Sequence, residues 1–129
     1  MEIVATQKYV RMSPTKLRLV VGAVAQIKDP TKMIQYLQFV PKRAAGVLAK
    51  TIKTAMANAK NNARQDVGSL RVKEIQIGEG PRLKRGRAGP RGMSSPIIKK
   101  TSHIRVVLET KDEEGGKLKA QSEKLKAAA

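Results

Sequence analysis

The chain has 129 residues, the size of one small domain, and 40% of them are hydrophobic, which allows a modest core. It has no Cys, which excludes disulfides and cysteine–zinc sites, and its formal net charge is +17. Residues 1–110 carry +16 of that charge, and a folded domain with such an imbalance repels itself unless a polyanion binds it.

The N-terminal part of the chain predicts one strand and two helices. Ile3–Val10 is a short mixed stretch that could form an edge strand. Ser13-Pro14 combines an N-cap residue with a residue suited to the first helical position, and the apolar spacing that follows predicts a helix from about Pro14 to Ala25. Asp29-Pro30 repeats this start signal before a second helix over Thr31–Val40.

A third helix, from about Pro41 to Asn61, is the clearest element of the sequence. Its basic side has no interleaved acids, which favours a surface that faces phosphates over a solvated helix face. The apolar side consists of Ala44, Leu48, Thr51, Ile52, Ala55 and Ala59. The opposite side consists of Lys42, Lys53, Lys60 and Arg64, with Arg43 and Lys50 beside them.

Two β-like stretches flank a basic segment and together predict one long antiparallel hairpin, over about residues 70–109. Leu70–Ile77 alternates imperfectly, which a β-bulge or a two-sided environment would explain. Residues 97–108 alternate cleanly at their C-terminal end. The basic segment, Gly80–Lys100, holds seven Lys or Arg and no acid. Its distal part has too few apolar residues to pack on a domain, so we expect it to project into another molecule.

Glycine and arginine give the basic segment its chemistry. Gly86, Gly89 and Gly92 allow tight bends and close approach of a phosphate backbone where a Cβ would obstruct it. Arg presents a planar fork that suits phosphate and also stacks on bases. The alternative is a flexible solvated loop, but structureless loops of this length are uncommon unless they are functional or disordered. The candidate phosphate-binding side chains are Arg82, Lys84, Arg85, Arg87 and Arg91.

Signals for catalysis, cofactors and membranes are weak. A small hydrolase could use the only His, His103, with Ser94 or Ser95, but neither serine has a neighbouring signal for activation. No cofactor-binding fingerprint, transmembrane-length run or secretory signal pattern occurs. We therefore expect no enzyme, no cofactor, no metal site and no membrane partner.

Nucleic acid is the leading class of partner. Because aromatic stacking platforms are nearly absent, the composition favours recognition of backbone and shape in a structured nucleic acid. An architectural DNA-binding protein with a basic β-arm is the alternative, but such proteins are usually dimers. The sequence shows no obvious dimer seam, and we expect no homo-oligomer.

The domain organisation follows from a change in composition near residue 110. Residues 1–110 are expected to form a single globular domain that includes the hairpin, with its tip at about residues 86–95. From Lys111 onward the chain is low in complexity and rich in Lys, Glu and Ala, so residues 111–129 are expected to be a disordered or partly helical tail.

Five sequence blocks together resemble the bacterial-type large-subunit ribosomal protein L-twenty-two family, in family order and at family-like spacing over about residues 5–110. The blocks are VRMSPTKLRLV (Val10–Val20), FVPKRAA (Phe39–Ala45), AMANAKNNA (Ala55–Ala63), VKEIQIGEGPRLKR (Val72–Arg85) and KKTSHIRVVLE (Lys99–Glu109). The C-terminal tail lies outside the resemblance.

The resemblance implies a fold and a function. The fold would be α+β, with three helices packed on a small three-stranded antiparallel sheet and one long protruding β-hairpin. The protein would be cytoplasmic, a structural constituent of the large subunit in a ribosome of bacterial or organellar type. It would bridge several domains of 23S-type rRNA early in assembly. Its globular part would lie near the polypeptide exit, and its hairpin tip would line the nascent-chain tunnel beside ribosomal protein L-four.

The resemblance also implies site residues by position. Contacts with rRNA would come from Arg11, Ser13, Lys16, Arg18, Lys42, Arg43, Lys84, Arg85, Lys99 and Lys100, and the basic faces add Lys53, Lys60 and Arg82. The tip that would line the tunnel and meet the nascent polypeptide is Gly86, Arg87, Ala88, Gly89, Pro90, Arg91, Gly92 and Met93. Met93 and Pro96 stand where basic residues are common in the family.

Overall fold

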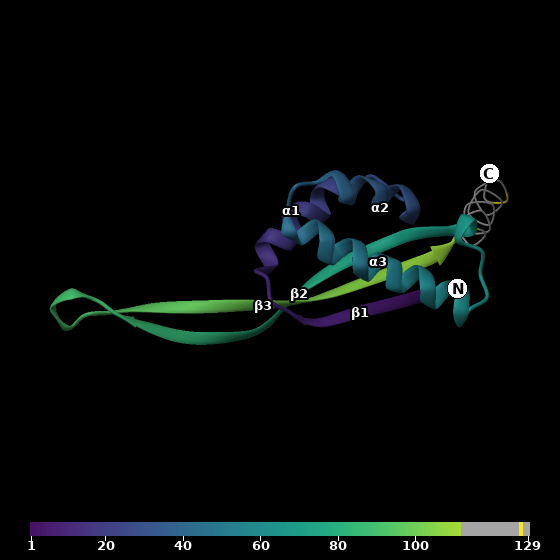
Figure 1. The fold of residues 1–129 in the computed structure, drawn as a ribbon. Coiled ribbons are helices and arrows are strands. Elements are labelled where there is room, and N and C mark those ends of the chain that lie inside the picture. Colours follow the sequence, from purple (N-terminus) through teal and green to yellow (C-terminus); the bar gives the residue numbers. More distant parts are fainter. Residues whose placement is uncertain (112–126, 128–129) are drawn as a thin grey trace.

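The computed structural model describes residues 1–111 and 127, so the tail expected over residues 111–129 lies outside the described residues except for Lys111 and Ala127. Three strands form one antiparallel sheet in the order β1-β3-β2, and α1, α2 and α3 all lie on one side of it (Figure 1). The elements are β1 (Glu2–Val10), α1 (Pro14–Val24), α2 (Pro30–Phe39), α3 (Arg43–Asn61), β2 (Leu70–Ala88) and β3 (Ser94–Thr110), with 3-10 turns at Val67–Ser69 and Pro90–Gly92. The predicted α+β fold is confirmed, and β1 is an edge strand.

The core lies between the helices and the side of the sheet that faces them. The alternating residues of β3, Ile104, Val106 and Leu108, are fully buried there. The six residues predicted for the apolar side of α3 are all buried as well. The alanines among them are small enough to let this helix approach β1 and β3 closely. Aliphatic side chains therefore build the core, while the only Phe, Phe39, is 86% exposed.

The helix boundaries differ from the predicted ones by one or two residues. The third helix begins at Arg43 and not at Pro41, because Lys42 has an extended backbone with a ψ of 136°. Ser13 and Asp29 do occupy the residue before α1 and α2, but neither side chain makes a capping hydrogen bond. At both helices, the proline that follows supplies the start signal.

A β-bulge at Lys73 explains the imperfect alternation of β2. The register with β3 shifts between Val72 and Glu74, which inserts one extra residue into β2. Beyond the bulge, Ile75 and Ile77 pack against the core on the same side as the buried residues before it. The bulge thus brings two out-of-phase apolar runs onto one face of the sheet.

The hairpin continues well beyond the helices as a free arm (Figure 1). Its strands remain paired from Arg82, opposite Lys100, to Ala88, opposite Ser94. Every residue from 81 to 100 is exposed. At about 3.3 Å per residue, the paired part of the arm beyond Arg82 extends about 20 Å.

The tip of the arm is a tight turn over Gly89–Met93, between the last residue of β2 and the first residue of β3. The Gly89 amide donates to the Met93 carbonyl at 2.6 Å. Arg91 and Gly92 have φ values of 58° and 70°, in the left-handed region that favours glycine. Residues 86–88 and 94–95, placed in the tip by the sequence analysis, continue the paired ladder, so the unpaired turn is shorter than that interval.

The hairpin leaves the sheet at a narrow neck around Gly80. The register shifts between Glu79 and Arg82, and the Thr101 hydroxyl donates to the Pro81 carbonyl at 2.6 Å. This bond holds Thr101 over Gly80, where a Cβ would lie 2.4 Å from Thr101 Oγ1 and 3.2 Å from its carbonyl carbon. The neck therefore requires glycine for space.

Gly80→Ala is expected to lower the free energy of unfolding by about 1–3 kcal/mol, the usual cost of forcing a methyl group into a packed site. Gly86→Ala is the matched control, because a Cβ at Gly86 would meet no atom within 4 Å. Denaturant unfolding followed by circular dichroism would measure both variants. Equal stability of the two would contradict the close approach of Thr101.

Candidate nucleic-acid interface

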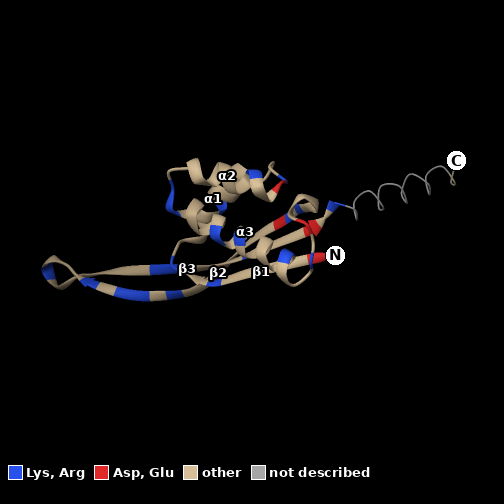
Figure 2. Cartoon of the chain, turned by 45° about the vertical axis from the view of Figure 1, so that its right-hand side comes forward, with Lys and Arg blue, Asp and Glu red and all other residues tan. Residues whose placement is uncertain are grey.

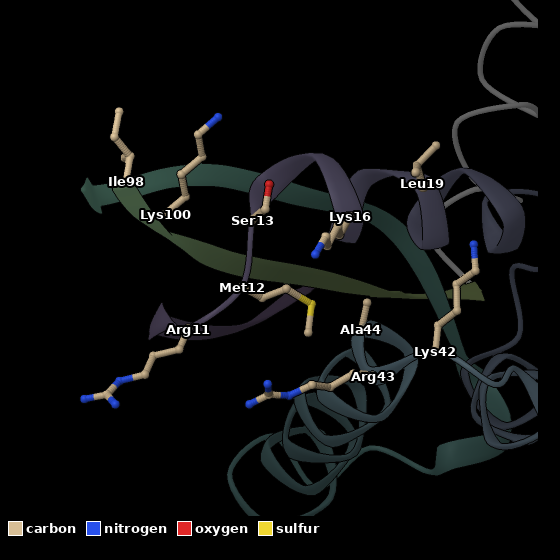
Figure 3. A pocket seen from close by; sticks show the side chains of 10 residues that line it. All are labelled: Arg11, Met12, Ser13, Lys16, Leu19, Lys42, Arg43, Ala44, Ile98 and Lys100. Carbon is tan, nitrogen blue, oxygen red and sulfur yellow. The ribbon is translucent and has the colours of Figure 1, made fainter. Parts of the chain in front are cut away.

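A hollow of about 740 Å³ lies where α1, the start of α3 and the base of the hairpin meet (Figure 3). We call it the cationic hollow. Three segments that are distant in sequence line it with polar residues: Arg11, Ser13 and Lys16, then Lys42 and Arg43, then Lys100. All six are among the residues predicted from the sequence, and no acidic residue lines the hollow.

The side chains of the cationic hollow come from different elements and extend in several directions (Figure 3). In Figure 3, Lys16 and Met12 point toward the middle, and the guanidinium groups of Arg11 and Arg43 extend toward one side. The cationic side chains that line the hollow make no hydrogen bond or ion pair with another residue in the described part of the chain. They are therefore available to an external anion.

A second hollow, of about 300 Å³, lies along the arm and is lined by Arg11, Leu83, Arg85, Lys99, Lys100 and Thr101. We call it the arm hollow. Arg11 and Lys100 line both hollows, so the two adjoin at the neck of the hairpin. Together they form one basic surface that runs from the start of α3 onto the arm, suited to a phosphate backbone that crosses the neck.

Acidic residues line neither hollow, and most of them lie away from this surface. In Figure 2 the projecting arm has blue segments among tan ones and no red segment, and red segments gather at the opposite end of the molecule, near the N-terminus. There Asp29 pairs with Lys32 and Lys111. Glu2 binds Lys73, and its hydrogen bond and charge raise the pKa of that lysine. Ion pairs within the protein therefore neutralise its basic side chains mostly away from the two hollows.

The other predicted residues lie outside the cationic hollow. Arg18 donates to the Ile77 carbonyl at 3.1 Å, which ties α1 to β2. Arg82 forms an ion pair with Glu79, also at 3.1 Å, at the base of the arm. Lys53 and Lys60 are exposed on α3, and the latter lines a separate shallow hollow beside Arg64. Lys84 is exposed on the arm opposite Ile98.

His103 has a structural contact that the sequence did not reveal. Its Nδ1 accepts a hydrogen bond from the Tyr9 amide at 3.0 Å, and the two rings meet edge to face with centroids 5.0 Å apart. Tyr9 adopts a φ of 58° at the irregularity in β1 between Gln7 and Val10. Eight residues of extended strand, roughly 26 Å, separate His103 from Ser95. This separation argues against a serine–histidine pair.

Comparison with known proteins identifies the family. The family described as ribosomal protein L22p/L17e matches residues 5–109. The chain belongs to this family. Three relatives are named large ribosomal subunit protein uL22, and each aligns with 84% of this chain. The protein from Opitutus terrae is 42% identical, and the alignment covers 95% of its length. The proteins from Desulfotalea psychrophila and Desulfatibacillum aliphaticivorans are 46% and 44% identical, and the alignments cover 98% and 99% of their lengths. The L22 match therefore includes both hollows and the hairpin up to Glu109.

Among residues 1–111 and 127, no three His, Cys, Asp or Glu side chains are placed to hold a metal ion. Within the same residues, no helix is long and apolar enough to span a membrane.

His103→Ala is expected to lower the free energy of unfolding by about 0.5–1.5 kcal/mol, because the Tyr9 amide loses its acceptor. Arg105→Ala is the control, since Arg105 is exposed two residues along the same strand. Thermal unfolding would compare the two variants with the unmodified protein. A larger loss for Arg105→Ala would show that the Tyr9–His103 contact contributes little.

Proposed function

We propose that this chain is a structural constituent of the large ribosomal subunit and binds 23S-type rRNA through its two hollows and its hairpin arm. The arm is the observation that carries the proposal. Residues 80–100 hold seven Lys or Arg and no acid, and residues 81–100 are all exposed. An isolated two-stranded hairpin is marginally stable in water at best, so an arm of this kind is suited to surroundings that cover it.

The shape of the molecule supports a bridging role. The arm extends about 20 Å beyond its base, whereas the cationic hollow lies beside the helices. One RNA segment bound at the hollow and another along the arm would be held at a fixed separation by the β2–β3 ladder. We propose that the protein thereby joins several rRNA domains early in assembly of the subunit.

The finer placement extends the family resemblance. The globular part would lie near the polypeptide exit, and the tip would line the nascent-chain tunnel beside ribosomal protein L-four. Arg91 and Met93 are both exposed in the turn that ends the arm, and Met93 is 74% exposed. A peptide that passes this tip would meet one cation and one apolar side chain. The role is structural, with no catalysis.

Lys84→Glu and Arg85→Glu are each expected to weaken incorporation into large subunits more than tenfold, because removing a charge-assisted hydrogen bond costs about 1.5–3 kcal/mol. Both side chains are exposed on the arm, so the domain should still fold. The control is Lys32→Glu, at an exposed α2 position that lines neither hollow. Subunits reconstituted from purified components would be assayed by sedimentation. Incorporation at the unmodified level by both arm variants would exclude these contacts.

Lys16→Gln is expected to make RNA binding less sensitive to salt. Removing one lysine–phosphate interaction should reduce the slope of log affinity against log salt concentration by roughly 0.7–0.9, because fewer counterions are released. Lys32→Gln serves as the control, because Lys32 is already paired with Asp29 at 3.4 Å. Titration with 23S-type rRNA fragments across a salt series would give both slopes. Identical slopes would place Lys16 away from phosphate.

A competition experiment tests the proposal as a whole. Fragments of 23S-type rRNA would compete with bent duplex DNA for the intact protein and for a version in which residues 86–95 are replaced by a short turn. Preference for rRNA by both proteins supports the ribosomal function and limits the role of the tip in affinity. Preference for bent DNA would identify an architectural DNA-binding protein instead.

A further inference from the structure

The cationic hollow has an apolar wall as well as cations. Met12, Leu19, Ala44 and Ile98 line it together with the basic residues. Leu19 is 65% exposed and Ile98 is 46% exposed, and neither belongs to the core. Phosphate neutralisation gives no reason for apolar side chains at these positions.

Convergence distinguishes these side chains from scattered surface residues. Single exposed apolar side chains are normal on a soluble protein. Here Met12 comes from the segment before α1, Leu19 from α1 and Ile98 from the arm, and all three line one hollow. Met12 is also partly buried and packs against the core, which holds this part of the apolar wall in place. The fold therefore brings both cationic and apolar side chains from separate segments into one hollow.

We propose that the cationic hollow receives one unpaired nucleotide of the bound RNA, with its base against the apolar wall and its flanking phosphates on the cations. This inference rests on the proposed function. The volume of about 740 Å³ lies within the roughly 300–1,000 Å³ of sites that hold small organic molecules.

The side chains present suit a base. A methionine thioether makes favourable contacts with aromatic rings, and an arginine plane stacks on bases. Met12 points toward the middle of the hollow, with Lys16 pointing there from another element and Arg43 at the edge (Figure 3). A base in the middle would meet the thioether, while the lysine and arginine would reach the phosphates on either side of it.

A paired helix would leave the apolar wall unused. In A-form RNA the base faces are stacked, the deep major groove is too narrow for side chains, and the shallow minor groove displays 2′-hydroxyls and base edges. Only an unstacked nucleotide presents a base face to the apolar side chains of the hollow. The structure thus favours a bulge or loop nucleotide as the occupant.

Two neighbouring isoleucines provide the test. Ile97 and Ile98 are consecutive on β3 and are 43% and 46% exposed, but only Ile98 lines the cationic hollow. Ile98→Ser is expected to weaken binding of 23S-type rRNA about twofold to tenfold at every salt concentration, with an unchanged salt slope because no charge is removed. Ile97→Ser is the matched control for loss of an apolar side chain on the arm outside the hollow, and it is expected to weaken binding less than Ile98→Ser does. Equal losses for the two variants, or no loss for Ile98→Ser, would overturn the proposal.

A crosslinking experiment identifies the occupant. p-Benzoylphenylalanine would replace Leu19, whose exposure makes the substitution compatible with folding. After binding to 23S-type rRNA and irradiation, primer extension would map the crosslinked positions. The proposal expects a crosslink at one unpaired nucleotide that the unmodified protein protects from 2′-hydroxyl acylation. Crosslinks confined to paired helices, or no crosslink to bound RNA, would overturn it. Failure of the unmodified protein to bind rRNA at all would instead reject the proposed function.

Discussion

The antiparallel ladder between β2 and β3 is the interaction on which the rest of the molecule depends. It runs from Leu70 opposite Thr110 to Ala88 opposite Ser94. Near the helices, buried side chains of both strands reinforce the backbone hydrogen bonds. Along the arm, those bonds act without a core and against the mutual repulsion of seven cations between residues 80 and 100. The same ladder thus forms the centre of the fold and holds the basic side chains of the arm at a distance from the globular part.

The neck is where these two environments meet. Gly80 and Thr101 approach closely there, and the register shift beside them redirects the strands out of the sheet. Arg11 and Lys100 stand at the same place and line both hollows. The position of the basic surface is therefore set by backbone geometry at the neck, although the charges themselves come from three separate segments. Changes that alter the neck would displace both hollows together.

Periodicity and composition predicted much of this structure, and long-range geometry accounts for the rest. The apolar side of α3, the clean alternation of β3 and the paired arm are local patterns, and the structure confirms them. The basic residues of the cationic hollow are implied by position through the family resemblance. The apolar wall of this hollow could not be predicted, because Leu19 and Ile98 are 79 positions apart and line one hollow only through the tertiary fold. The Tyr9–His103 contact spans 94 positions and has no local signature either.

The closed turn at Gly89–Met93 limits how the arm can change length during evolution. Both strands are fixed at the neck and paired up to the turn, so an extra residue in one strand alone would form a bulge or reverse every side chain beyond it. One extra residue in each strand would lengthen the arm by about 3.3 Å and turn the tip to the opposite face. Two extra residues in each strand would restore the facing at about 7 Å of added reach. The length of the arm can therefore change only in discrete steps. Length variants that keep the tip on the same face must add or remove two residues in each strand together.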